Sequence, residues 1–139
     1  MRILGFDPGD KHIGWGLLIN GEPFRAGVLH DWTALPKLIK RCGPEWVVVE
    51  AFRLYRQKAL AQSGSDMQTS QVIGMLRLIC VEQGVKMVTQ PAARIRHDPL
   101  VKGIKFHKSK HANDAVKHAL AFHFRVYTDA YIAPKERVK

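Results

Sequence analysis

The sequence predicts a mixed α/β sheet of five strands with helices on both faces, and three observations lead to this fold class. Apolar, β-favouring residues open the chain, and Asn20-Gly21 then joins two further strand-like segments in the manner of a tight hairpin turn. The segment EWVVVE at 45–50 is apolar between its two carboxylates, which is typical of a strand buried on both faces. Segments with helical periodicity separate the later strands. The predicted order is β-β-β-α-β-α-β-α within a single domain over residues 1–139.

The first three strands are expected to form an antiparallel unit. Residues 2–7 are an apolar run, and residues 12–19 and about 23–29 flank the hairpin turn. The two later strands, 45–50 and 85–90, are separated by a helical segment, which favours parallel pairing.

Helices are predicted where apolar residues recur at helical spacing. The first covers residues 33–42 and is stopped by Gly43 and the proline after it. The second covers 65–83, with Ser65 opening a capping box, and the last starts at the N-cap residue Ser109. The apolar stripes of the second and last helices are Val72, Met75, Leu76 and Ile79, and Ala112, Ala115, Val116, Ala119 and Leu120.

Positive charge exceeds negative charge by a wide margin. The chain has 22 Lys and Arg residues against 12 Asp and Glu, a formal net charge of +10. Such an excess in a small domain indicates a polyanionic partner, nucleic acid first, because neutralised phosphates release their counterions. The basic residues are dense between Arg94 and Lys110, where Asp98 is the one acidic residue. The alternative is a basic protein whose charge serves solubility alone.

Membrane and secreted proteins are disfavoured. No apolar run approaches the ~18 residues of a membrane span, and the first residues lack the pattern of a secretory signal. Cys42 and Cys80 stand far apart and outside any CxxC pair, so we expect buried free thiols in a reducing compartment. The chain is therefore expected to be cytoplasmic and to make no membrane contact.

Carboxylates end two of the predicted strands, at Asp7 and Glu50. If these strands pair in parallel, both carboxylates lie at one edge of the sheet, where ligand sites of open α/β folds collect. In the last helix, His111 and Asp114 stand three residues apart on one face. Such a set suits divalent cations, Mg²⁺ first, which in turn hold a phosphodiester. His118, one turn beyond Asp114, is expected to support the site or to face solvent rather than to bind metal.

Each of these residues also has a simpler interpretation. Asp7 lies in the sequence DPG, which is good turn chemistry. Glu50 finishes an apolar strand and needs a partner if it is buried, and His111 with Asp114 forms a solvated pair if the helix turns outward. The combination of all four favours the metal site.

Three motifs resemble one known family. GFDPG at 5–9, VVVEAFRLY at 47–55 and HANDAVKHAL at 111–120 resemble, in this order, the RuvC-type Holliday-junction resolvases of the RNase H-like superfamily. The resemblance is greatest to the short RuvC-like proteins of bacteriophages and covers roughly residues 2–124. It implies an RNase H-like fold and a metal-dependent endonuclease that resolves Holliday junctions or other branched DNA in recombination and repair.

The resemblance also implies a set of ligands. In the family, an Asp on the first strand, a Glu on the fourth and a pair on the last helix bind two Mg²⁺ ions, and these positions fall on Asp7, Glu50, His111 and Asp114. Asp7 would bridge both ions, Glu50 would hold one, and His111 with Asp114 would hold the other. The family usually has an aspartate where His111 stands. Because imidazole is a softer ligand than carboxylate, we expect Mn²⁺ to be tolerated well.

Residues around this site are expected to contact DNA. Cations suit phosphates, hydroxyl groups at a helix start donate to phosphates, and a tyrosine ring stacks on an opened base. The residues are Arg53, Tyr55, Arg56, Lys58, Ser65, Thr69, Ser70, Lys102, Lys105, Lys108 and Lys110. Because a four-way junction has two equivalent strands to cut, we expect a twofold-symmetric homodimer, with the helix at 65–83 in its interface.

Two other functions remain open. The first is a small rRNA-processing nuclease of the same superfamily, whose opening also reads D-x-G but which lacks the apolar strand ending in VE. The second is a catalytically idle module that binds branched DNA by shape. Retention of all four candidate ligands argues against the second.

Overall fold

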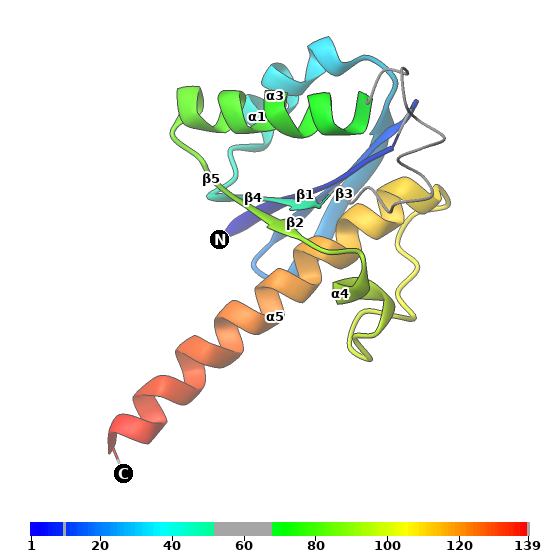
Figure 1. Ribbon diagram of the computed structural model, residues 1–139. Coiled ribbons are helices and arrows are strands. Elements are labelled where there is room, and N and C mark those ends of the chain that lie inside the picture. The colour runs from blue at the N-terminus through cyan, green and yellow to red at the C-terminus, as the bar shows by residue number, and fades with distance from the viewer. Residues whose placement is uncertain (10, 52–67, 139) are drawn as a thin grey trace.

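The computed structural model describes residues 1–9, 11–51 and 68–138, with the side chains of 68 and 127–138 left out. Within these residues five strands form one sheet in the order β3-β2-β1-β4-β5 (Figure 1). The strands are β1 (Arg2–Pro8), β2 (Ile13–Ile19), β3 (Glu22–Leu29), β4 (Trp46–Glu50) and β5 (Lys86–Gln90). β1, β2 and β3 pair antiparallel, whereas β4 pairs parallel with both β1 and β5. The mixed sheet predicted from the sequence is therefore confirmed.

The predicted hairpin turn is confirmed in its backbone. Asn20 and Gly21 have φ angles of 51° and 83°, and they connect Ile19 directly to its pairing partner Glu22. Two successive positive φ angles are what a two-residue turn requires to follow the twist of the strands, and Asn and Gly accept them most readily.

Helices cover both faces of the sheet. α1 (Leu35–Cys42) and α3 (Gln68–Gln83) lie on one face, and α5 (Lys110–Val138) crosses the other and continues beyond the sheet (Figure 1). A 3₁₀ turn, η1 (Trp32–Ala34), precedes α1, and the short α4 (Ala93–Arg96), which was not predicted, follows β5. α1 ends at Gly43, as predicted, and Gly43 has the left-handed conformation. α3 starts within the predicted helix at 65–83, and the first three residues of that prediction, Ser65 included, lie outside the described residues.

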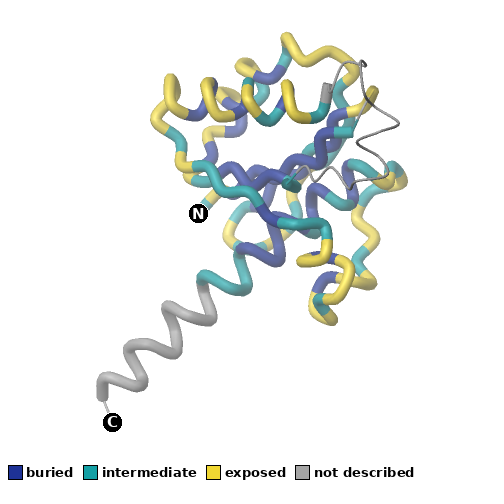
Figure 2. The backbone as a smooth tube through the Cα atoms, in the orientation of Figure 1, coloured by how far each residue is buried: buried dark blue, intermediate teal, exposed yellow. Residues whose placement is uncertain are grey.

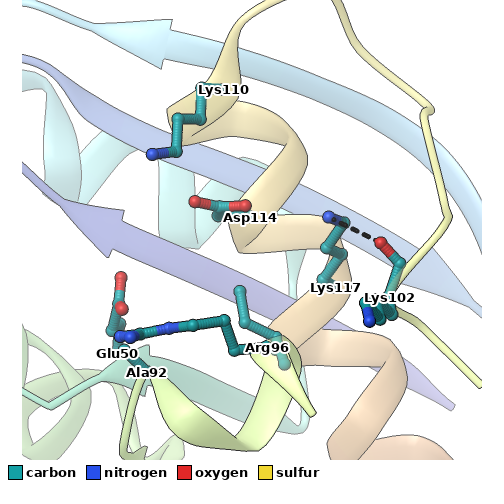
Figure 3. A pocket seen from close by; sticks show the side chains of 8 residues that line it. Glu50, Ala92, Arg96, Lys102, Lys110, Asp114 and Lys117 are labelled. Atoms are coloured by element: carbon teal, nitrogen blue, oxygen red, sulfur yellow. Dashed lines mark hydrogen bonds between the residues drawn. The ribbon is translucent and has the colours of Figure 1, made fainter. Parts of the chain in front are cut away.

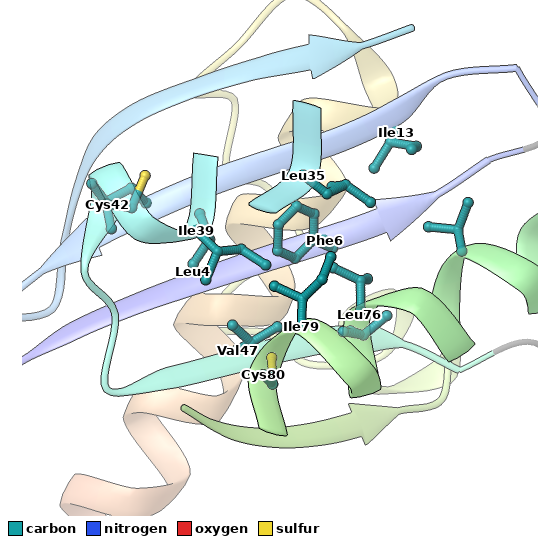
Figure 4. Packing of buried hydrophobic residues seen from close by; sticks show 13 residues of the cluster. Leu4, Phe6, Ile13, Leu35, Ile39, Cys42, Val47, Leu76, Ile79 and Cys80 are labelled. Carbon is teal, nitrogen blue, oxygen red and sulfur yellow. The ribbon is translucent and has the colours of Figure 1, made fainter. Parts of the chain in front are cut away.

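Two apolar clusters hold the layers together, because neighbouring strand residues point to opposite faces. Leu4, Phe6 and Val47 pack under α1 and α3 (Figure 4). Ile3 and Val48 pack against α5 instead. Figure 2 shows the burial along the strands and along the part of α5 that lies on the sheet. The predicted stripes are confirmed, although Met75 is half-buried. Cys42 and Cys80 are buried free thiols, as expected.

Glycines in β1 and β2 bring α5 unusually close to the sheet. A Cβ atom on Gly5 would overlap the carbonyl of Ala115, and one on Gly14 would overlap the backbone of His111. Because these positions have no side chain, the first turns of α5 rest directly on the strands. This contact decides where the polar side chains of α5 lie.

Candidate active site

The carboxylates of Asp7 and Glu50 meet at one edge of the sheet. β1 and β4 pair in parallel with Phe6 opposite Val49, so the next residue of each strand carries its carboxylate to the same edge. Asp7 is 8% exposed, and the side chain of Glu50 is 21% exposed. The convergence predicted from strand pairing is present.

His111 reaches this edge from α5. Its Nδ1 lies 3.0 Å from Oδ2 of Asp7, and its ring is partly exposed. Gly14 is the register partner of Asp7 in β2, and the backbone of His111 rests on that glycine. The contact between Gly14 and the backbone of α5 therefore also brings the imidazole of His111 to Asp7.

Asp114 faces Glu50 across a pocket of about 530 Å³ (Figure 3). The charged residues that line it are Glu50, Arg96, Lys102, Lys110, Asp114 and Lys117. Two acidic groups thus sit among four cationic ones. A pocket with this lining fits a ligand that brings both negative charge and positive counter-charge, as a phosphodiester with a divalent cation does.

Burial and crowding shift the pKa values of the carboxyl groups in the site. Burial, and after it the hydrogen bond and charge of Glu50, raise the pKa of Asp7 to about 9. Burial opposes ionisation of Glu50 too, but His118, Asp7 and Arg96 lower its pKa to about 2. The pair of Asp7 and Glu50 therefore retains one proton, as expected when two carboxyl groups crowd together.

The pKa of Asp114 is also raised. Burial is the main cause and the charge of Glu50 adds to it, while Lys117 and Lys110 act in the opposite direction. Carboxylates that resist ionisation in the protein alone favour a bound cation, since a cation restores their charged form.

The donor set fits a divalent cation that keeps part of its water shell. In the described ranges, no group of three or more His, Cys, Asp or Glu side chains is arranged so that it could hold a metal ion. The carboxylates instead line or border an open pocket. Such a site suits a hard divalent cation, which takes a few carboxylates and completes its shell with water and phosphate oxygens.

The predicted DNA contacts divide into four groups. Lys102 and Lys110 line the pocket, whereas Lys105 and Lys108 are exposed and do not line it. Thr69 and Ser70 lie in the first turn of α3. The others lie outside the described residues: Arg53, Tyr55, Arg56, Lys58 and Ser65.

Two cations that line the pocket were not singled out from the sequence. Arg96, at the end of α4, extends toward Glu50 (Figure 3). Lys117 donates from Nζ to the carbonyl of Lys102 at 3.2 Å. Lys117 stands three residues after Asp114, a spacing that places the two on one helix face and could have indicated its position.

Asn113 fixes the basic loop, residues 97–109, to the start of α5. Its Oδ1 accepts from the backbone N–H groups of Phe106 at 2.7 Å and His107 at 3.2 Å, and its Nδ2 donates to the carbonyl of Ile104 at 2.7 Å. Asn113 is 8% exposed. A buried amide with three backbone partners fixes the loop that carries Lys102. The sequence could have indicated a special role for Asn113, because asparagine is disfavoured inside a helix and this one stands in a helix otherwise rich in alanine.

Comparison with curated proteins gives two relatives that share one name. No family model matches the chain. It is 27% identical to "Crossover junction endodeoxyribonuclease RuvC" of Sorangium cellulosum, over 74% of this chain and 64% of the relative. It is also 27% identical to the protein of that name from Thermomicrobium roseum, over 69% of this chain and 66% of the relative. The chain is similar in sequence to RuvC. It spans slightly less than two thirds of the length of these curated relatives.

Solved structures show that the chain has the RuvC fold. Thermus thermophilus RuvC in complex with a Holliday junction substrate matches with a TM-score of 0.74 at 21% identity, covering 92% of this chain and 96% of that one. Fowlpox virus resolvase, solved with Holliday junction DNA, matches with a TM-score of 0.63 at 13% identity, covering 91% and 99%. No helix among the described residues combines the length and the hydrophobicity needed to cross a bilayer.

Proposed function

We propose that the chain is a metal-dependent, structure-selective endodeoxyribonuclease that cuts Holliday junctions or other branched DNA. Asp7 lies beside both His111 and Glu50, and Asp114 faces Glu50 across a pocket lined with cations. This arrangement is the observation that carries the proposal. Sequence similarity to RuvC supports the same activity. Residues 1–139 would act as one RNase H-like nuclease domain in the cytoplasm of a bacterial or phage-infected cell. The likeness to the short bacteriophage proteins stays a prediction.

The four polar residues would hold two divalent cations, Mg²⁺ or Mn²⁺. Asp7 would contact both ions, and its position beside His111 at 3.0 Å and beside the carboxylate of Glu50 supports this role. Asp114 faces Glu50 across the pocket. When bound, the cations supply Lewis-acid activation of water and neutralise charge on the phosphate. His111 must be neutral to bind metal, so activity falls in acid.

The surrounding cations would hold the scissile phosphodiester. Arg96, Lys102, Lys110 and Lys117 border the acidic pair, so a phosphate in the pocket meets positive charge on several sides. Water would add to phosphorus and the bond to the 3′ oxygen would break. The attacking water would lose a proton and become part of the 5′-phosphate, and the leaving 3′ oxygen would take up a proton to give a 3′-hydroxyl.

The other predicted DNA contacts would extend this surface along the branches. Lys105 and Lys108 are exposed on the loop that Asn113 fastens, so they are available to phosphates beyond the pocket. Thr69 and Ser70 stand at the start of α3, and the residues from Arg53 to Ser65 stay predictions.

A homodimer would present two such sites to the two equivalent strands of a junction. α3 is our candidate for its interface. Leu78 and Val81 on this helix are 59% and 78% exposed, and a Cβ atom on Gly74 would meet nothing within 4 Å. Exposed apolar side chains beside a glycine, which has no side chain to keep a neighbour away, favour close contact with another helix. Sedimentation of wild type and Leu78→Glu tests this, since the charge would split a dimer built on α3. A single species of the same mass for both would refute it.

The function is tested on synthetic four-way junctions, forks, flaps and plain duplex incubated with Mg²⁺. We expect wild type to cut the junction fastest, and Asp7→Asn to cut at least about 100-fold more slowly, the loss that ~3 kcal/mol of transition-state stabilisation gives. Cleavage of structured RNA in preference to branched DNA would indicate the rRNA-processing alternative. Tight junction binding by wild type without Mg²⁺-dependent cleavage would indicate the idle binding module.

A further inference from the structure

A buried polar pair lies directly behind Glu50. Gln90, the last residue of β5, is 1% exposed, and His118 on α5 is fully buried. Two of their polar atoms, Oε1 of Gln90 and Nε2 of His118, are buried without a hydrogen-bond partner among the described residues. Such atoms are costly in a core, so they call for an explanation beyond packing.

The contacts of Gln90 fix the tautomer of His118. Nε2 of Gln90 lies 3.1 Å from the backbone carbonyl oxygen of His118 and 3.1 Å from its ring Nδ1. A carbonyl oxygen only accepts, so the amide atom that faces it is the nitrogen. An amide nitrogen only donates, so Nδ1 must accept and the ring proton must be on Nε2. The neutral imidazole thus carries its N–H on the side away from Gln90.

That N–H group lies beside Glu50. Nε2 of His118 is 3.9 Å from Oε1 of Glu50, which is longer than a hydrogen bond. The Glu50 side chain borders the pocket and is partly exposed, so it has room to rotate, whereas the imidazole is enclosed. A small rotation of Glu50 would satisfy the buried N–H.

We propose that His118 is a positioning residue for Glu50, donating from Nε2 to one carboxylate oxygen so that the other is held toward the pocket. Gln90 acts one step further back, since it keeps the imidazole in the donating tautomer. The inference rests on the proposed function, in which Glu50 binds a divalent cation. Partners of this kind orient the ligands of a metal, and their loss costs about 10–100-fold in affinity.

The tautomer is tested first, by ¹⁵N NMR of the His118 ring in the metal-free protein. We expect an unprotonated Nδ1 and a protonated Nε2 near neutral pH. A proton on Nδ1 would overturn the proposal whatever the protein does to DNA. Because this measurement needs wild type alone, it does not depend on the folding of any variant.

The effect on Glu50 is tested by direct Mn²⁺ binding, measured by calorimetry. We expect His118→Leu to weaken binding about 10-fold or more. His118→Gln keeps an N–H donor close to the place of Nε2 and should keep most of the affinity. Gln90→Leu should give an intermediate loss. Val72→Ala is the matched control, because it removes buried apolar volume on the opposite face of the sheet.

The outcomes separate this inference from the proposed function. Wild type that binds no Mn²⁺ would refute the metal site itself. Wild-type affinity in His118→Leu, or a loss equal to that in Val72→Ala, would refute the role of His118 and leave the metal site standing. Equal losses in His118→Leu and His118→Gln would also refute it, since they would point to packing alone.

Discussion

The imidazole Nδ1 of His111 lies 3.0 Å from the carboxylate of Asp7, although 104 residues separate the two in the chain. Gly14 explains how they meet. It pairs with Asp7 in the sheet and leaves the space in which the backbone of His111 rests. The first turn of α5 is therefore seated on the strand that neighbours Asp7.

Gly14→Ala is expected to disturb both the fold and the site. The new methyl group would overlap the backbone of His111, so α5 must shift, at a cost of about 1–3 kcal/mol. Thermal unfolding measures the loss of stability, and Mn²⁺ binding measures the loss of alignment. Gly103→Ala is the matched control, because its methyl group meets nothing within 4 Å. Equal stability of the two variants would contradict the seating of α5 on Gly14.

Asp7→Asn is expected to stabilise the metal-free protein. Folding raises the pKa of Asp7 from 3.8 to about 9. The folded state is therefore most favoured over the unfolded state below about pH 3.8, and this stabilisation is lost as the pH rises through about 9. In EDTA at about pH 8, Asp7→Asn should unfold about 3–6 °C higher than wild type, which corresponds to roughly 1 kcal/mol in a domain of this size. The difference should shrink toward about pH 4.

Addition of Mg²⁺ should reverse the order of these two proteins. A cation that binds the folded state stabilises wild type by mass action, whereas Asp7→Asn lacks a ligand. If the melting temperature of wild type changed neither with pH nor with Mg²⁺, the result would contradict the raised pKa of Asp7 and its role as a metal ligand.

Asn113→Ala is expected to release the basic loop. Three hydrogen bonds to backbone groups at Ile104, Phe106 and His107 are lost, so we expect a cost of about 1–3 kcal/mol in stability. Junction affinity should fall, because Lys102 is no longer held at the pocket. Asn113→Asp, which can still accept from two N–H groups, should lose less. Junction affinity that is unchanged in Asn113→Ala would show that the loop holds its position without this residue.

His111→Asp is expected to change the choice of metal. Replacement of an imidazole by a carboxylate makes the site harder, so the ratio of the Mn²⁺-supported to the Mg²⁺-supported cleavage rate should fall. The ratio is internal to each protein, so differences in expression or folding cancel. A ratio that does not change, or one that rises, would show that His111 does not set the preference for Mn²⁺.

Strand pairing made much of the site predictable. A short apolar segment ending in Glu50 has to be a central strand, and its parallel pairing with the first strand brings the two carboxylates together. The three-residue spacing of His111 and Asp114 likewise placed them on one helix face. These inferences depend on local periodicity, which one sequence carries.

Contacts made by single side chains could not be predicted in this way. Arg96 extends toward Glu50 because of the short helix α4, whose few residues carry no clear periodicity. The amide of Asn113 and the buried pair of Gln90 and His118 depend on the tertiary distance between α5, the loop and β5. Propensity does not report such distances.

The central claim is that Asp7, Glu50, His111 and Asp114 form one metal-dependent site that cuts branched DNA. Its most direct test compares wild type with Asp7→Asn, Glu50→Gln, His111→Ala and Asp114→Asn in cleavage and binding of one four-way junction. We expect each variant to cut at least about 100-fold more slowly in Mg²⁺ and still to bind the junction, because the cations of the pocket remain. Wild-type cleavage by any one of the four, or no cleavage by wild type bound to the junction, would contradict the claim.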